Sequence, residues 1–218
     1  MDVTADPTDL RAIRAAGIAG LVFAVTLTTS LVLLRIDPVV LSSVDDDGVV
    51  QVSDATLVAL YLIPFSGIAF AWFIAALRRR IGRLEDQLFA TVFLASGLLF
   101  IAMLFASGAA ASAAVAASRF GAQPAAGSVA FVFGASLAKT LFYAFAVKMA
   151  GAFMLVSSTI GRRTGAFPRW FVLVGMVAGL VMLFSVGFFE PLALIFPAWV
   201  AGVSVLLLRA HPDSWREG

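Results

Sequence analysis

The stretch at residues 128–163 reads SVAFVFGASLAKTLFYAFAVKMAGAFMLVSSTIGRR, and it is long and apolar enough to cross a bilayer as one helix. It also carries Lys139 and Lys148, which are the two lysines of the chain. A cation inside a membrane helix costs at least ~2.5–3.5 kcal/mol on insertion scales, so such a residue usually faces protein, water or a partner. The two lysines are therefore the first candidates for a functional site.

The composition of the whole chain is that of a membrane protein. Of its 218 residues, 61% are hydrophobic and 13% are charged, whereas a soluble domain has about 45–50% apolar and about 25% charged residues. The apolar residues form runs of about twenty, separated by short charged clusters, which is the pattern of bilayer-spanning helices. The sequence therefore predicts a single all-α, polytopic domain with room for about six spans and little else.

Six transmembrane spans are expected, at about residues 13–34, 55–77, 88–111, 129–158, 170–188 and 192–208. Pro64 lies inside the second span, where we expect a kink. Residues 107–114 are almost all Ala, Ser or Gly, which predicts close packing against another helix, with a surface-lying connection as the alternative. Gly175 and Gly179 form a GxxxG pair in the fifth span, which is expected to make a tight hairpin with the sixth.

The longest polar segment, residues 36–54, is expected to be an extracellular loop. It contains Asp45-Asp46-Asp47-Gly48, whose Asp-Gly step is a turn signal, and the runs at 39–41 and 49–52 could pair as a short hairpin on the membrane surface. We interpret the Asp triplet as a solvated turn rather than a calcium loop. The alternating ligands and the final Glu of an EF-hand are missing.

Arginine is distributed unequally between the two sides of the predicted membrane. One side comprises the two terminal tails and the loops after the second and fourth spans, and it holds eleven arginines: Arg11, Arg14, Arg78, Arg79, Arg80, Arg83, Arg162, Arg163, Arg169, Arg209 and Arg216. The other side holds Arg35 and Arg119. Because cytoplasmic loops carry the excess of positive charge, both termini are expected in the cytoplasm.

The residue inventory excludes several classes of chemistry. The chain has no cysteine, and its single histidine, His211, lies in the C-terminal tail, so thiolate sites and paired-histidine metal or haem sites inside the membrane are excluded. A net charge of +2 gives no reason to expect nucleic acid as a partner. Ser136 and Lys139 match the S-x-x-K spacing of some hydrolases, but the companion motifs are absent. We therefore expect no enzyme, cofactor or metal.

Lys139 lies on a polar strip of its helix, with Ser136 three residues before it and Tyr143 four residues after it. Two interpretations are open. Lys139 could pair with Glu190, which lies at the turn between the last two spans. Alternatively, its ammonium group could reach the outer membrane interface along its own aliphatic stem.

No acidic residue of the chain is expected at the same depth in the membrane as Lys148. In a straight α-helix, nine residues turn through about 900°, so Lys148 is expected to point away from Lys139. Three interpretations are open: Lys148 lines a polar cavity that admits an anion or a lipid headgroup, pairs with an acid of a partner protein, or bonds to neutral oxygens in a structural role. The candidate acceptors are the carbonyl freed by Pro64 and the hydroxyls of Thr26, Thr28, Thr29, Ser30 and Ser66.

Two further stretches form recognisable motifs. One is Ile160-Gly161-Arg162-Arg163-Thr164-Gly165-Ala166-Phe167-Pro168-Arg169-Trp170, followed by a glycine-containing apolar hairpin; the other runs from Pro64-Phe65-Ser66-Gly67 through Arg78-Arg79-Arg80-Ile81-Gly82 to Leu98-Leu99-Phe100. Both resemble segments of multipass membrane proteins of high-GC actinobacteria that share a domain of unknown function. The resemblance implies a six-helix protein of the bacterial inner membrane, and it implies no activity or functional residue.

These observations favour a non-enzymatic membrane protein with a lysine-bearing polar cavity around the fourth span. The cavity would bind or pass a small anionic or amphiphilic solute, or a lipid headgroup, through Lys148, Lys139, Tyr143, Ser136 and Glu190. The alternative is an accessory or scaffold subunit whose Lys148 and small-residue faces pack against a second copy or a partner membrane subunit. An open polar cavity would favour the first hypothesis, and an exposed Gly/Ala face with Lys148 toward lipid would favour the second.

Overall fold

In a computed structural model, the described residues are 7–36, 52–81, 87–120, 129–185 and 190–209, and they are almost entirely helical without a strand among them. In chain order the helices are α1 (Pro7–Ile36), α2 (Asp54–Ile81), α3 (Gln87–Phe120), α4 (Val129–Lys139), the π-helical turn η2 (Thr140–Ala146), α5 (Val147–Arg163), α6 (Arg169–Phe184), the 3-10 helix η3 (Glu190–Leu194) and α7 (Ile195–Arg209). The segments α4, η2 and α5 follow one another without a break and form one helix. The all-α prediction is confirmed.

Five segments of the described chain are helical, long and apolar enough to cross a membrane: Arg14–Ile36, Asp54–Arg78, Leu88–Ala117, Val129–Arg163 and Pro191–Arg209. Helix α6 is shorter than the others, with 16 residues. At 1.5 Å per residue it is about 24 Å long, whereas the hydrocarbon core of a bilayer is ~30 Å thick. Length and composition therefore support a polytopic membrane protein with five full-length apolar helices.

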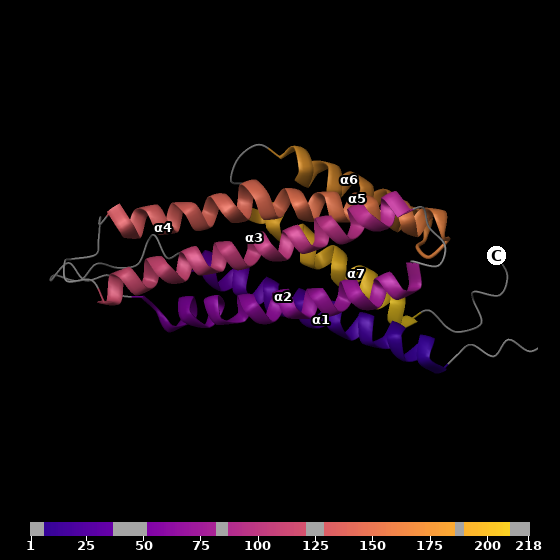
Figure 1. Ribbon diagram of the computed structural model, residues 1–218, viewed down its shortest axis with the longest axis horizontal. Helices are drawn as coiled ribbons and strands as arrows, with labels where there is room; N and C mark the ends of the chain where they lie inside the picture. The colour runs from indigo at the N-terminus through magenta and orange to yellow at the C-terminus, as the bar shows by residue number, and fades with distance from the viewer. Residues whose placement is uncertain (1–6, 37–51, 82–86, 121–128, 186–189, 210–218) are drawn as a thin grey trace, which may run out of the picture.

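The long helices lie side by side in one bundle, and the start of α1 and the end of α7 are at the same end of it (Figure 1). Helix α2 packs along α1, α3 along α2, and the continuous α4–η2–α5 helix along α3, so neighbours in sequence are neighbours in space. Helix α7 returns to α1, whereas α6 packs on the outer side of α5. The predicted tight hairpin of the last two spans is wrong in this respect, because α6 and α7 pack against different helices. They meet at the stacked rings of Phe171 and Trp199, whose centroids are 6.0 Å apart.

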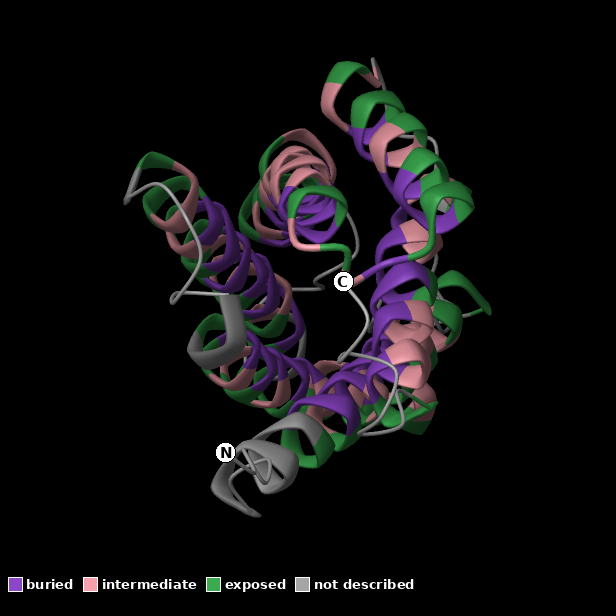
Figure 2. Cartoon of the chain, turned by 90° about the vertical axis from the view of Figure 1, so that its right-hand side faces the viewer, coloured by how far each residue is buried: buried purple, intermediate pink, exposed green. Residues whose placement is uncertain are grey.

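Each helix is buried on one side only. In the view along the bundle, buried stretches face one another and exposed stretches face outward (Figure 2). Much of the exposed surface is apolar, as on α6, where Trp170, Leu173, Val177 and Phe184 are all more than half exposed. Such a continuous apolar surface suits contact with lipid chains, because the backbone polar groups between the ends of a helix are bonded within it.

The centre of the bundle is a cluster of five phenylalanine rings, one from each of five helices: Phe23 of α1, Phe70 of α2, Phe100 of α3, Phe153 of α5 and Phe196 of α7. We call it the Phe70 cluster, because the Phe70 ring contacts the other four at centroid distances between 4.6 and 5.3 Å. All five side chains are at most 2% exposed. Rings at these distances in tilted and edge-to-face arrangements attract one another beyond the effect of area burial.

Small residues bring the outer helices against this centre, as the sequence predicts. Gly151 of α5 and Gly179 of α6 face each other so closely that a Cβ on Gly151 would lie 2.7 Å from the Gly179 carbonyl oxygen. The close-packing role of the GxxxG pair is therefore confirmed. The Ala-rich tract is part of α3, and its Ala114 lies against Gly134 of α4, which excludes the alternative of a surface-lying connection.

Two predictions about the second span and its preceding loop have different outcomes. Helix α2 continues on both sides of Pro64, which lies in its interior, and the kink expected there stays a prediction. Ser66, two residues later, has two acceptors within reach of its one hydroxyl proton, the Leu62 carbonyl and Thr26 Oγ1, both at 2.9 Å. The acidic turn at 45–48 and most of the expected hairpin fall in residues 37–51, outside the described part of the chain.

Replacing Phe70 tests whether the aromatic cluster holds the helices together. We expect Phe70→Ala to lower the free energy of unfolding by ~3–5 kcal/mol, because it removes a ring that contacts four helices. The matched control is Phe65→Ala on the same helix, since Phe65 is 46% exposed, and it should change stability by no more than ~0.5 kcal/mol. Denaturant titration in detergent micelles measures both, and equal losses would contradict a central role for the cluster.

Candidate functional site

A cavity of about 130 Å³ lies in the half of the bundle that is away from the termini. Its walls come from the second half of α1, the first half of α2, the second half of α3, the helix through η2, and the residues around the start of α7. Leu, Ile, Ala and Phe side chains supply most of the lining. The volume is comparable to the ~150 Å³ of an apolar cavity that takes up benzene, so it has room for a short apolar group.

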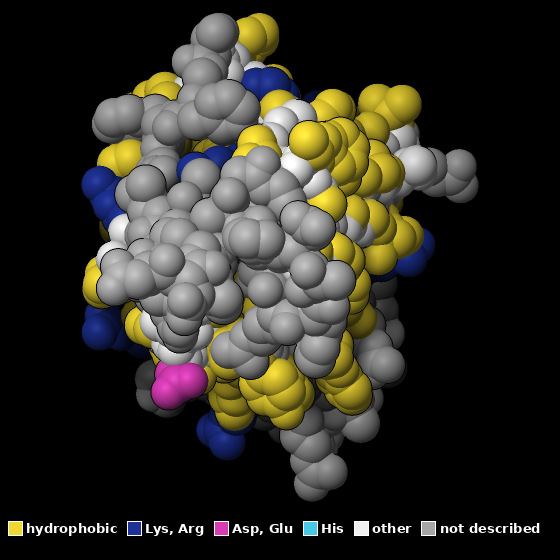
Figure 3. Space-filling model, turned by 90° about the vertical axis from the view of Figure 1, so that its left-hand side faces the viewer, with side chains coloured by type: hydrophobic (Ala, Val, Ile, Leu, Met, Phe, Trp, Pro, Cys, Tyr) yellow, Lys and Arg dark blue, Asp and Glu magenta, His cyan; other side chains and the backbone are white. Residues whose placement is uncertain are grey.

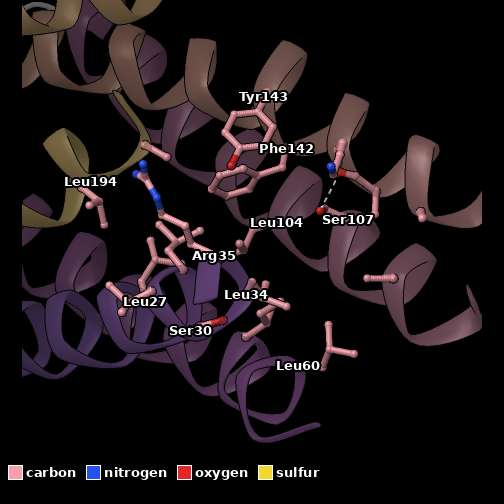
Figure 4. Close-up of a pocket in the computed structure, with 18 residues that line it drawn as sticks. Leu27, Ser30, Leu34, Arg35, Leu60, Leu104, Ser107, Phe142, Tyr143 and Leu194 are labelled. Atoms are coloured by element: carbon pink, nitrogen blue, oxygen red, sulfur yellow. Dashed lines mark hydrogen bonds between the residues drawn. The ribbon is translucent and has the colours of Figure 1, made fainter. Parts of the chain in front are cut away.

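Two cations line this mostly apolar space, Arg35 from α1 and Lys139 from the end of α4. Both side chains are exposed. Arg35 extends toward Leu194, and the Tyr143 hydroxyl lies on the same side of the cavity (Figure 4). We call the site the Arg35–Lys139 cavity.

The surroundings of the Arg35–Lys139 cavity provide little negative charge. Among the side chains that the structure describes, Asp54 is the one acid, and no ion pair joins Arg35 or Lys139 to a described residue. Figure 3 views the bundle from this end and shows an acidic side chain (magenta) among hydrophobic and basic ones. In its described part the site therefore combines an apolar interior with net positive charge.

The serine hydroxyls in the cavity wall already donate their protons to carbonyl groups. Ser30 Oγ donates to the Ala59 carbonyl of α2 at 2.8 Å, and Ser107 Oγ of α3 donates to the Ala138 carbonyl of α4 at 2.9 Å. Each bond ties two helices together, so these hydroxyls act mainly in helix packing.

The π-helical turn η2 forms the wall next to Lys139. Its wide geometry is seen in the bond from the Val147 N–H to the carbonyl of Phe142, five residues earlier. Phe142 and Tyr143, which belong to this turn, line the cavity, and their rings meet edge to face at 5.2 Å. The sequence TLFYAFA contains no Gly or Pro, so nothing in it indicates a change of helix type.

Lys148 does not line the Arg35–Lys139 cavity. Its Nζ donates to the carbonyl oxygen of Ser185 at 2.9 Å, at the C-terminal end of α6. The last carbonyls of a helix lack partners within it and carry the negative end of the helix dipole, so a lysine is a favourable partner there. The geometry thus matches the structural interpretation of Lys148, with an acceptor on α6 rather than at Pro64 or on the hydroxyls of the first two spans.

The other predicted site residues are separated from this group. Ser136 is exposed and does not line the cavity; its carbonyl accepts a bond from Thr140 Oγ1 at 2.9 Å. Glu190 begins η3, but its side chain lies outside the described part, so a Lys139–Glu190 pair stays a prediction. Of the five predicted residues, the structure brings Lys139 and Tyr143 together. Arg35 is the residue that sequence reasoning misses, because the sequence analysis considers it only in the distribution of arginine between the two sides of the membrane.

Comparisons of the chain with models of protein families, with curated proteins and with solved structures give no match. The resemblance to actinobacterial membrane proteins therefore stays a prediction. The function has to be argued from the geometry of the Arg35–Lys139 cavity.

Amine reactivity distinguishes the two lysines. We expect a small water-soluble acylating reagent to modify Lys139 at least about tenfold faster than Lys148 in intact membranes. Lys139 is exposed and Lys148 is half-buried and bonded, and breaking a hydrogen bond of a charged group costs ~1.5 kcal/mol or more. Mass spectrometry of the peptides, with Lys139→Arg and Lys148→Arg as references, measures the rates. Faster modification of Lys148 would instead place it in a water-connected cavity.

Removal of the Lys148 amine tests its role at the end of α6. We expect Lys148→Met to lower the free energy of unfolding by ~1.5–3 kcal/mol, the usual contribution of a hydrogen bond to a charged group. Lys139→Met is the matched control, since it removes the same charge from an exposed position. If the two variants were equally stable in a denaturant titration, the bond to Ser185 would not support the fold.

Proposed function

We propose that this protein binds an anionic amphiphile in the Arg35–Lys139 cavity. The anionic head would lie at the two cations, and an apolar segment would occupy the space between α1 and the α4–η2–α5 helix. The observation that carries the proposal is the combination, in one cavity, of an apolar lining with two cations that no described acid neutralises.

An amphiphile suits the site better than a small inorganic anion does. A hydrated anion that entered the apolar interior would lose water without gaining equivalent hydrogen bonds, which is unfavourable. The wall serines offer little replacement, since their protons are bonded to the Ala59 and Ala138 carbonyls. A ligand with a charged head and an apolar chain matches both parts of the lining.

Binding is favoured over passage by what lies deeper in the bundle. The Phe70 cluster fills the interior beyond the cavity, and its rings are almost completely buried. A solute that crossed the membrane along the bundle axis would have to displace five packed rings, which protein interiors resist because of their density.

The accessory-subunit hypothesis has less support from the described residues. That hypothesis is based on small-residue helix faces that could pack against a partner. Gly151 and Gly179 are instead in contact with each other, Gly134 faces Ala114, and Lys148 is bonded to Ser185. These features are therefore used within the chain.

We place the protein in a bacterial inner membrane with six crossings and both termini in the cytoplasm. Support comes from the start of α1 and the end of α7, which are at the same end of the bundle. On this topology, α6 is the fifth crossing despite its short length. The arginines whose side chains are described agree with it, because six of the seven lie at the end of the bundle where α1 starts and α7 ends: Arg14, Arg78, Arg162, Arg163, Arg169 and Arg209. Arg35 is the seventh and lies at the other end.

Native mass spectrometry of the purified protein tests the proposed binding. We expect the protein to retain phosphatidylglycerol in preference to phosphatidylcholine from mixed micelles. Lys139→Met and Arg35→Met should each weaken this preference roughly fivefold, because one cation near anionic lipid contributes ~1 kcal/mol. Arg209→Met, which removes an exposed cation at the opposite end, should leave the preference unchanged.

A second ligand shows whether the bound anionic amphiphile is a membrane phospholipid or a free fatty acid. Oleate carries the same combination of anionic head and apolar chain as phosphatidylglycerol, but it is not a membrane phospholipid. Retention of oleate and not phosphatidylglycerol would indicate a free fatty acid as the ligand. Equal retention of phosphatidylglycerol and phosphatidylcholine, together with no retention of oleate, would refute the proposed function.

A further inference from the structure

The π-helical turn η2 is an unusual feature in an otherwise regular helix. The helix runs from Val129 to Arg163, and only Thr140–Ala146 departs from α geometry. π-Helical residues make up well under ~1% of residues in proteins, and such turns occur often at functional sites. Gly and Pro, the residues that commonly distort helices, are absent from this turn, so its cause has to lie in the surrounding structure.

Side-chain bonds hold the helix on both sides of the wide turn. Before it, Ser107 of α3 donates to the carbonyl of Ala138 at 2.9 Å. After it, Lys148 donates to the carbonyl of Ser185 on α6 at 2.9 Å. These hydrogen bonds thus tie α4 to α3 and α5 to the residue that ends α6, while α5 also packs on α3, and the wide turn joins the two parts.

The wide turn also changes the relation between the two lysines that the sequence predicts. A π turn takes up about one extra residue without advancing the helix by a further ~100°. The nine residues from Lys139 to Lys148 then turn through about 800°, as eight residues of a straight α-helix would. The two side chains are therefore about 80° apart around the axis rather than opposite. The side chains before and after η2 point in the same relative directions as they would in a straight α-helix with one residue fewer.

We propose that η2 is a one-residue insertion that shapes the wall of the Arg35–Lys139 cavity and is not required for the fold. Two of its residues, Phe142 and Tyr143, line the cavity and follow Lys139 by three and four positions. Removing one residue from the turn should restore a continuous α-helix and preserve the packing of α4 on α3 and of α5 on α6. The narrower turn should withdraw the Phe142 and Tyr143 rings from the cavity wall. The inference rests on the proposed function for the identity of the ligand, whereas its prediction that the shortened chain still folds is independent of any ligand.

Deletion of Ala144 is the direct test. Ala144 lies in the wide turn, has a small side chain and does not line the cavity. We expect the deletion variant to elute as the wild type in size-exclusion chromatography, to keep its helical circular dichroism, and to lose at least about tenfold in affinity for phosphatidylglycerol in the native mass spectrometry assay. The matched control is deletion of Ala152 from the regular helix α5, which rotates all later residues by ~100° and should abolish folding.

Each outcome of the deletion decides the inference. If the Ala144 variant does not fold, the residue is not an insertion and the inference is wrong. If the variant folds and binds phosphatidylglycerol as the wild type does, η2 does not shape the site, although the proposed function stands. Folding together with loss of binding supports the inference.

A readout without lipid separates the inference from the proposed function. The chain contains no cysteine, so Tyr143→Cys introduces a single thiol in the cavity wall. We expect a water-soluble maleimide to modify this thiol at least about tenfold more slowly after deletion of Ala144, because the narrower turn withdraws residue 143 from the cavity. Unchanged reactivity would overturn the inference even if the wild type bound no lipid.

Discussion

The contact of the Phe70 ring with one phenylalanine from each of four other helices is the constraint around which this bundle is arranged. In a bilayer, lipid chains are as apolar as the side chains, so helices gain little from merely hiding apolar surface, and the fit of side chains against one another has to hold them. The Phe70 cluster provides that fit for α1, α2, α3, α5 and α7. Helix α6 has no residue in it and depends on α5 instead, through Gly151 and Gly179.

The polar side chains of the bundle fall into two kinds. Serine and lysine side chains act across helix pairs, as Ser30 does to the Ala59 carbonyl, Ser107 to the Ala138 carbonyl and Lys148 to the Ser185 carbonyl. Arg35 and Lys139 are different, because neither is bonded to an acid in the described part of the chain and both border an apolar space. Groups of the first kind hold helices together, and those of the second kind carry a charge that no described acid neutralises.

Much of the fold is predictable from the sequence because long apolar runs leave few alternatives to helices. The small-residue contacts of α3 and α6 were also predictable, since Gly and Ala in helical spacing indicate close approach. The centre was not: the chain has 20 phenylalanines, and in helices that are apolar on all sides no periodicity separates Phe70 from the exposed Phe65. Likewise the wide turn and the position of Arg35 in the cavity wall depend on contacts between helices. Neither the sequence TLFYAFA nor the residues at the end of α1 contain a pattern that indicates these contacts.

The bond from Lys148 to the Ser185 carbonyl joins residues 37 positions apart in the chain. During biosynthesis, the nascent α5 would therefore present its lysine to the translocon before the acceptor on α6 has been made. Inserting a lysine alone costs ~2.5–3.5 kcal/mol at the centre of a helix, and α6 is too short to be a strong insertion signal by itself. In a bilayer, the two helices would therefore support each other: the lysine gains an acceptor at the end of α6, and the short α6 gains a partner helix.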